Sequence, residues 1–138
     1  MTALVASLLA LILATIFDFW KREIPDSIPI ALLVWAAGTT AFGVSSQGWA
    51  SLALGLGLGF AIGAGLFWLG GFGGGDAKLL AAVGAALGPR PFLAFLFCAA
   101  IAGGVLAAIA LARGKRDLAY APAMALGLVV LMMIRGMR

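Results

Sequence analysis

Asp18 and Asp76 are the two residues of this chain whose type and position are best suited to chemistry. Each is an acid at the end of a long apolar run, and an ionisable side chain at membrane depth is costly enough to mark a candidate functional site. Two carboxylates in one pocket do not both ionise cheaply, so such a pair shares a proton. The ionised partner can take a proton from a water that attacks a peptide carbonyl, and the protonated partner can donate to the leaving nitrogen. The chemistry that the two aspartates predict is peptide hydrolysis.

Three glycines directly precede Asp76, and a lysine follows it two residues later. Glycines remove side-chain bulk, so Gly73, Gly74 and Gly75 would let an extended substrate backbone come close. We expect these glycines to bind substrate, and we expect Lys78 either to contact substrate or to tune the acid. The alternative is that Asp76 is only a helix N-cap, whose carboxylate satisfies free backbone N–H groups. A cap explains the aspartate but does not explain the three glycines before it.

The composition restricts the kind of protein that can hold these acids. The chain has 138 residues, of which 64% are hydrophobic and 10% charged, and its mean hydropathy is +1.18. Soluble domains carry about 25% charged residues, so we expect an integral membrane protein in contact with the lipid bilayer. The net charge of +4 is then a signal of membrane topology, and no nucleic acid is expected as a partner.

Cofactor chemistry has little support in the sequence. There is no histidine, and the single cysteine, Cys98, lies within an apolar run. A metal site of imidazole or thiolate ligands, a disulfide framework and a catalytic group with a histidine base are therefore excluded. No glycine run continues into a phosphate-binding or dinucleotide-binding motif either. We expect the chain to use neither a metal nor another cofactor.

Charged clusters and turn residues divide the chain into apolar pieces that are mostly of the length of a transmembrane helix, about 20 residues. The predicted spans are residues 1–17, 28–44, 49–69, 77–87, 92–112 and 118–134. Six helices use nearly the whole sequence. We therefore expect an all-α fold, a six-helix transmembrane bundle with short loops, in which residues 1–138 form a single domain.

The charges predict which way this bundle faces. The loops after the first, third and fifth spans share one face, and their cations are Lys21, Arg22, Lys78, Arg113, Lys115 and Arg116. The opposite face has Arg90, Arg135 and Arg138. The positive-inside rule makes the first face cytoplasmic and puts both termini outside. All five acids lie on the cytoplasmic face, where we expect Glu23 and Asp26 to be loop charges or helix caps.

The fourth predicted span is too short to cross the hydrocarbon core. From Asp76 to Arg90 an α-helix would rise about 21 Å, whereas the core is about 30 Å thick. We therefore expect the glycine run at residues 70–75 to be irregular backbone that dips below the cytoplasmic surface, which is tolerated where it lines a wet cavity. Asp18 also lies near the cytoplasmic end of its helix, so the two acids should meet at one depth.

Stripes of small residues indicate where helices approach closely, because glycine or alanine at every fourth position lets helix backbones meet in lipid. The third span has two such stripes, at Gly55, Gly59 and Gly63 and at Gly57, Ala61 and Gly65. The fifth span has one, at Ala99, Gly103 and Ala107. We interpret these stripes as packing surfaces of the bundle.

Two stretches of the chain have the features of a known family. The first runs from Asp18 to Asp26 and contains an acid, basic residues and the sequence Ile24-Pro25-Asp26. The second is Gly73-Gly74-Gly75-Asp76, a Gly-x-Gly-Asp element that is followed by Lys78. A weaker third element, Tyr120-Ala121-Pro122-Ala123, stands at the start of the last span. In order, spacing and layout, the chain resembles the prepilin peptidases, which are membrane aspartic proteases of the GxGD type.

The resemblance implies that Asp18 and Asp76 are the catalytic pair. It implies cleavage of the leader from type IV prepilins, just after a glycine that precedes the hydrophobic helix, at the cytoplasmic face of the bacterial inner membrane. The substrate would be a transmembrane helix with a short basic leader. Larger members also methylate the new N-terminus and have an extra segment with paired cysteines. Without that segment, this chain resembles the short peptidases associated with Flp/Tad pili.

Two functions of other classes also fit parts of the sequence. A small transporter or channel subunit would use the acids to bind a cation or to relay protons, as broken helices within a membrane do. A purely structural membrane partner is the third alternative, and the clustering of the acids on one face weighs against it. Reconstituted protein would conduct ions or solutes as a transporter, and would cleave peptide as a peptidase.

Overall fold

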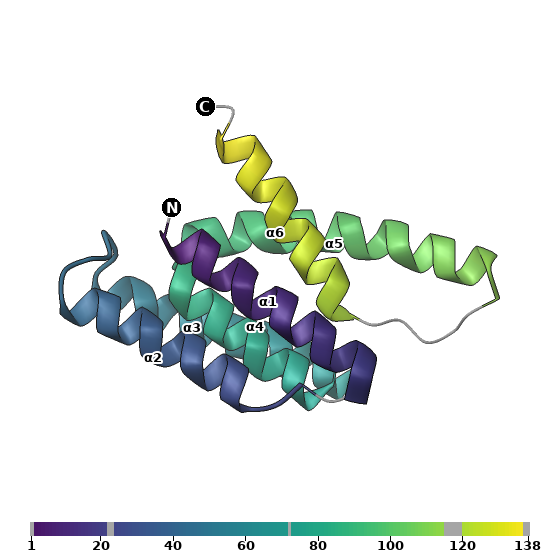
Figure 1. Cartoon of the computed structure of the whole chain (residues 1–138), viewed down its shortest axis with the longest axis horizontal. Coiled ribbons are helices and arrows are strands. Elements are labelled where there is room, and N and C mark those ends of the chain that lie inside the picture. Colours follow the sequence, from purple (N-terminus) through teal and green to yellow (C-terminus); the bar gives the residue numbers. More distant parts are fainter. Residues whose placement is uncertain (1, 22–23, 72, 115–119, 137–138) are drawn as a thin grey trace.

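The computed structural model describes residues 2–21, 24–71, 73–114 and 120–136, and over these residues the chain forms six helices (Figure 1). They are α1 (Thr2–Lys21), α2 (Ser27–Ala41), α3 (Trp49–Trp68), α4 (Gly74–Leu87), α5 (Pro89–Ala112) and α6 (Tyr120–Gly136). Each helix lies within a few residues of a predicted span, so the expected all-α fold is confirmed. By length and composition, α3 and α5 are suited to cross a membrane.

The short helix α4 is the core of the molecule. Each residue from 79 to 87 is buried, as expected of a helix that is apolar on all sides. Helix α4 packs along α3 most extensively, and it also contacts α2, α1 and α5. A helix of 14 residues rises only about 20 Å, so α4 is shorter than α1, α3 and α5.

One glycine stripe of α3 makes the contact with α4. Gly55 lies against the backbone of Gly84, and a Cβ atom on Gly59 would lie 2.5 Å from the carbonyl oxygen of Leu80. The expected packing role of the stripe at 55, 59 and 63 is therefore confirmed. On the second stripe, a Cβ atom on Gly57 would have no atom within 4 Å, so that residue faces away from the helices the structure describes.

The loop between α2 and α3 closes the far end of α4. Gln47 donates hydrogen bonds from Nε2 to the carbonyl oxygens of Ala85 (3.0 Å) and Ala86 (3.2 Å), which are left free at a helix end. Gly88 then ends α4 with a φ of +75°. The sequence predicted a turn here but not this cap. It also started the fifth span at residue 92, whereas α5 begins at Pro89, because proline suits the first turn of a helix.

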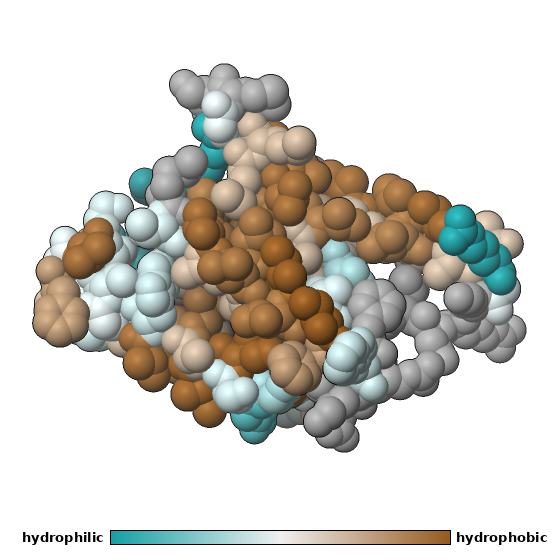
Figure 2. Space-filling model, viewed as in Figure 1, coloured by the Kyte–Doolittle hydropathy of each residue, from teal (hydrophilic) through white to brown (hydrophobic). Residues whose placement is uncertain are grey.

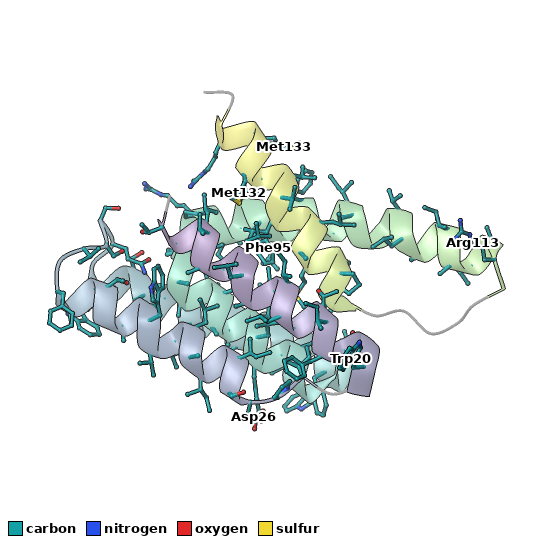
Figure 3. The ribbon with its side chains drawn as sticks, viewed as in Figure 1. Trp20, Asp26, Phe95, Arg113, Met132 and Met133 are labelled. Carbon is teal, nitrogen blue, oxygen red and sulfur yellow. The ribbon has the colours of Figure 1, made fainter. Side chains whose placement is uncertain are left out.

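Helices α5 and α6 form a pair on one side of the core. Gly127 of α6 lies directly against the backbone of Ala99, and a Cβ atom on Gly103 would lie 3.6 Å from the Cβ atom of Ala123. The start of α5 enters the core through Phe92 and Phe95, which are both 0% exposed. The other end of α5, near Arg113, extends beyond the remaining helices (Figures 1 and 3).

The outer surface is strongly apolar. Of the helices described, each except α4 exposes large apolar side chains to its surroundings. Figure 2 shows these side chains as a nearly continuous brown area over the centre of the molecule, with polar groups toward its edges. A patch of this extent is rare on soluble monomers and marks contact with a membrane or another apolar partner.

The connections between helices gather at two ends of the bundle. The α1–α2 and α3–α4 connections lie at one end, where Trp20 and Asp26 also lie (Figures 1 and 3). The α2–α3 loop lies at the opposite end, beside the α4–α5 junction. Successive helices therefore run in opposite directions through α4, which brings the ends of α1 and α3 to the starts of α2 and α4.

Candidate active site

A cavity of about 230 Å³ opens where these connections meet. Its lining residues are Asp18, Ile24, Asp26, Gly73, Gly74, Gly75 and Asp76. The structure thus brings together the two aspartates that the sequence singled out, from the last turn of α1 and the first turn of α4. It brings the three glycines to the same cavity. The space suffices for several water molecules or for a short piece of peptide backbone.

The two carboxylate oxygens of Asp76, a residue that lines the cavity, have different surroundings. Its Oδ2 atom accepts a hydrogen bond from the backbone N–H of Gly73, at 3.3 Å. Its Oδ1 atom is buried and has no hydrogen-bond partner among the described residues. A buried acceptor without a partner costs about 1–3 kcal/mol, so a water or a substrate group that reached this oxygen would bind it favourably.

The start of α4 differs from the expectation. Residues 70–75 were expected to be irregular. Of the described residues in this run, Gly70, Gly71 and Gly73 lie outside any helix, as expected, and Gly73 is extended, with φ −74° and ψ 157°, whereas Gly74 and Gly75 already belong to α4. Asp76 is consequently the third residue of the helix rather than its N-cap. It still satisfies a free N–H group near the helix start, which favours a carboxylate there.

Asp18 occupies a helix position that disfavours it. It is half-buried in the last turn of α1, which continues to Lys21. A negative charge near a helix C-terminus is repelled by the helix dipole, so neither capping nor the dipole accounts for an acid here. The same side chain lines the cavity that Asp76 lines, which gives Asp18 a neighbour with which it can act.

Asp26 is a third carboxylate of this cavity, and its side chain does not cap α2. It instead accepts hydrogen bonds from Lys78 at both oxygens, each at 2.8 Å. This ion pair is largely exposed, with 57% of the Lys78 side chain and 59% of the Asp26 side chain accessible. Lys78 therefore contacts Asp26, and it is not among the residues that line the cavity. The sequence pattern gave no signal for this pair, because Asp26 and Lys78 lie far apart in the chain.

Gly75 is required by the protein itself. A Cβ atom there would lie 2.9 Å from the Cβ atom of Ile24 and 3.3 Å from its carbonyl oxygen. Gly74 has more space, since a Cβ atom would meet only Phe67 Cε2 at 4.0 Å. The absent side chain of Gly75 thus lets the α1–α2 connection approach α4, which brings Asp18 and Asp76 to one cavity.

Gly75→Ala should therefore destabilise the fold, whereas Gly74→Ala should not. The added methyl group at position 75 must displace Ile24, and overpacking of this kind typically costs about 1–3 kcal/mol. Thermal unfolding of the purified variants in one detergent would measure the difference. Equal melting temperatures would contradict the close contact between Gly75 and Ile24.

Some predicted residues lie outside the described part of the chain. These are Arg22, Glu23, Lys115, Arg116, Asp117 and Arg138, together with the side chains of Lys21 and Tyr120. Among the residues that are described, no three side chains of the types His, Cys, Asp and Glu form a group that would hold a metal ion.

Fold and cavity together define an apolar helical protein with an acid-lined site at one end. The sequence matches the model of the type IV leader peptidase family over residues 5–108, a range that includes every residue lining the cavity. The chain belongs to this family and is a type IV leader peptidase-like protease. Family membership and the two long apolar helices indicate a membrane protein. No curated protein and no solved structure matches it significantly.

Proposed function

We propose that this chain is a membrane aspartic endopeptidase of the GxGD type and that Asp18 and Asp76 are its catalytic pair. The observation that carries the proposal is that both aspartates line one cavity. The Oδ1 atom of Asp76 is also buried without a partner among the described residues. In the proposed mechanism the two acids close on the substrate and share one proton, which supplies a base and an acid together.

The reaction needs no group beyond these two acids and water. The ionised carboxylate accepts a proton from the water as the water oxygen bonds to the peptide carbonyl carbon. The protonated carboxylate donates its proton to the peptide nitrogen as the C–N bond breaks. One product leaves as a carboxylic acid and the other as an amine. The hydrogen bond from the Gly73 N–H group orients the Asp76 carboxylate for this reaction.

The glycines before Asp76 support a substrate-binding role. Gly73 is extended and Gly74 has open space beside it, so a substrate strand can pass close to the backbone there. A helical substrate hides its carbonyl groups, and cleavage therefore requires an unwound segment. We propose that residues 73–75 receive this unwound segment.

We further propose that the chain is one domain of six membrane spans, with the cavity at the cytoplasmic side of a bacterial inner membrane. The rise of α4, about 20 Å against a core of about 30 Å, supports a cavity beneath the membrane surface. The substrate is then a prepilin of the Flp type. Its apolar helix lies in the bilayer, and its leader junction lies at the acids.

Co-expression with a Flp-type prepilin tests the proposed function. The expected result is a shortened pilin whose new N-terminus follows the glycine of the leader junction, measured by mass spectrometry. A prepilin with that glycine replaced by a bulky residue is the matched control and should stay uncut. Ion flux through reconstituted protein, without any cleavage, would support a transporter instead.

Lys78→Met should lower cleavage roughly fivefold and leave stability nearly unchanged. The ion pair with Asp26 is exposed, so its loss should cost about 0–1 kcal/mol of stability. Without Lys78, the negative charge of Asp26 is uncompensated, and it disfavours the ionised carboxylate that the reaction needs in the same cavity. If this repulsion raises the barrier by about 1 kcal/mol, the rate falls roughly fivefold. Rates and melting temperatures of the purified variants would measure both effects.

The double variant Lys78→Met with Asp26→Asn provides the control for that charge. Removing the Asp26 charge should restore most of the lost rate. If the double variant were as slow as Lys78→Met alone, the Asp26 charge would not be the cause of the defect.

A further inference from the structure

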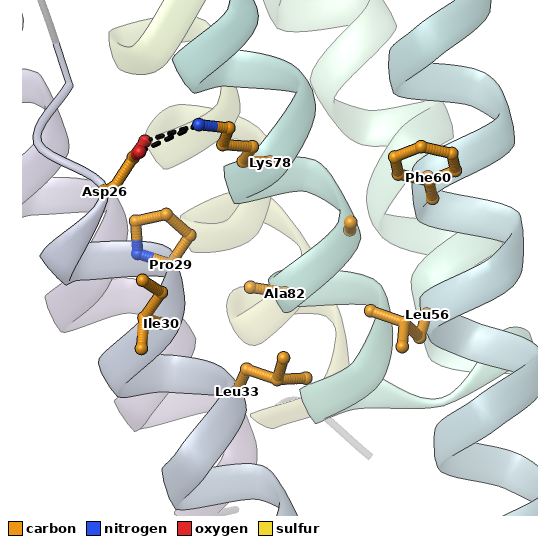
Figure 4. A pocket seen from close by; sticks show the side chains of 9 residues that line it. Asp26, Pro29, Ile30, Leu33, Leu56, Phe60, Lys78 and Ala82 are labelled. Carbon is orange, nitrogen blue, oxygen red and sulfur yellow. Dashed lines mark hydrogen bonds and ion pairs between the residues drawn. The ribbon is translucent and has the colours of Figure 1, made fainter.

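A second hollow lies beside the catalytic cavity, between α2 and α3 and above α4. It has a volume of about 310 Å³. Its lining residues are Asp26, Pro29, Ile30, Leu33, Leu56, Phe60, Lys78, Ala81 and Ala82. Figure 4 shows α4 as its floor, with α2 on one side and α3 on the other. We call this hollow the α2–α3 groove.

The groove follows from how the helices pack. Both α2 and α3 pack against α4, but they make little contact with each other. Ala81 and Ala82 of α4 form the floor of the groove. Both residues are buried, and their small apolar side chains leave space above them. The walls, in contrast, bear larger apolar side chains such as Ile30 and Phe60, which are 58% and 62% exposed.

Its charges lie at one end only. Asp26 and Lys78 form their ion pair at the end of the groove nearest the start of α2, and the rest of the lining is apolar (Figure 4). Asp26 also lines the catalytic cavity. The groove and the cavity therefore adjoin each other at Asp26, and a chain that leaves the cavity past this residue reaches an apolar surface.

We propose that the α2–α3 groove binds the apolar helix of the substrate, immediately beyond the peptide bond that is cut. This inference rests on the proposed function, and it identifies the surface on the enzyme that holds the substrate in register. The substrate changes along its chain from a polar, unwound segment to an apolar helix. The surfaces of the enzyme change in the same order. The acid-lined cavity comes first, the ion pair follows, and the apolar groove comes last.

The size of the groove determines how much of the helix it receives. From Asp26 to Leu33 the wall of α2 rises about 10 Å, and a substrate helix of that length and about 10 Å diameter fills roughly 800 Å³. The groove holds about 310 Å³. It therefore receives a few side chains from one face of the helix, while the opposite face stays in the bilayer.

Cysteine crosslinking tests this inference. Cys98 is the single cysteine of the chain and is replaced by serine, after which Phe60→Cys places a thiol in the groove. Leu54→Cys is the matched control, because Leu54 lies on the same helix, is 61% exposed against 62% for Phe60, and does not line the groove. Asp76→Asn keeps the prepilin uncut, and single cysteines are moved along its apolar helix.

Phe60→Cys should crosslink at least fivefold more than Leu54→Cys, at prepilin positions that recur every three to four residues. Equal crosslinking at both positions would overturn the inference and indicate that lipid chains occupy the groove.

In the active enzyme, Phe60→Ala should raise KM about fivefold with kcat unchanged, and Leu54→Ala should change neither. If the unaltered chain cleaved no prepilin, the proposed function would fail. If it cleaved prepilin but Phe60→Ala and Leu54→Ala behaved alike, only the groove would be excluded.

Discussion

Replacing Asp18 or Asp76 by asparagine should abolish peptide cleavage and leave the helical bundle folded. An amide can neither accept a proton from water nor donate one as a carboxylic acid does, and each general acid or base contributes about 10²–10⁴-fold to a rate. Neither change should disturb the fold. Asp76→Asn retains a side-chain oxygen for the Gly73 N–H group, and Asp18→Asn removes a charge that the helix dipole disfavours. Prepilin processing and thermal unfolding of each purified variant would measure the two outcomes.

Asp26→Asn is the control within the same cavity. Asp26 lines the cavity as Asp18 and Asp76 do, but its carboxylate is exposed and paired with Lys78. We expect this variant to keep its rate to within about fivefold, the size of an exposed charge interaction. Normal cleavage by Asp18→Asn or Asp76→Asn would remove that residue from the mechanism. An equal loss in all three variants would make the site a group of three acids.

The sequence predicted the helices well because their ends have local causes. Charged clusters cannot enter an apolar core, and the polar turn at residues 45–48 divides an uncharged run that is long enough for two helices. The shifted boundaries also have local causes. Helix α5 gains a turn at Pro89, and α4 gains Gly74, Gly75 and Asp76, since glycine and proline are tolerated in the first turn of a helix.

The sequence also predicted that the two aspartates meet, because alternating helices put the end of α1 and the start of α4 on one face. It did not predict the partner of Lys78, the cap from Gln47 or the α2–α3 groove. Each of these depends on the distance and rotation between helices that pack side by side, which the sequence pattern does not give. The two glycine stripes of α3 illustrate the limit. Both have the same spacing, and only the packing partner decides that Gly59 faces inward and Gly57 outward.

Gly59→Ala should therefore disrupt the fold, although alanine favours a helix. A Cβ atom at position 59 would lie 2.5 Å from the carbonyl oxygen of Leu80 and 2.8 Å from the Cα atom of Ala81. Both are backbone atoms, so a side-chain rotation cannot relieve the overlap and the two helices must separate. Overpacking typically costs about 1–3 kcal/mol, and on that scale we expect about 2 kcal/mol or more in the free energy of unfolding. Thermal or denaturant unfolding in detergent would measure it.

Gly57→Ala on the same helix is the matched variant, and it should raise the free energy of unfolding instead of lowering it. Its new methyl group would meet nothing within 4 Å, and alanine favours a helix over glycine by about 1 kcal/mol. If both variants were destabilised alike, the α3–α4 contact would not depend on the inward stripe. Gly59→Ala should also reduce cleavage, because α4 bears Asp76 at its start and a displaced α4 moves that carboxylate away from Asp18. A substitution at a residue that does not line the cavity would thus impair catalysis through the packing of α4 alone.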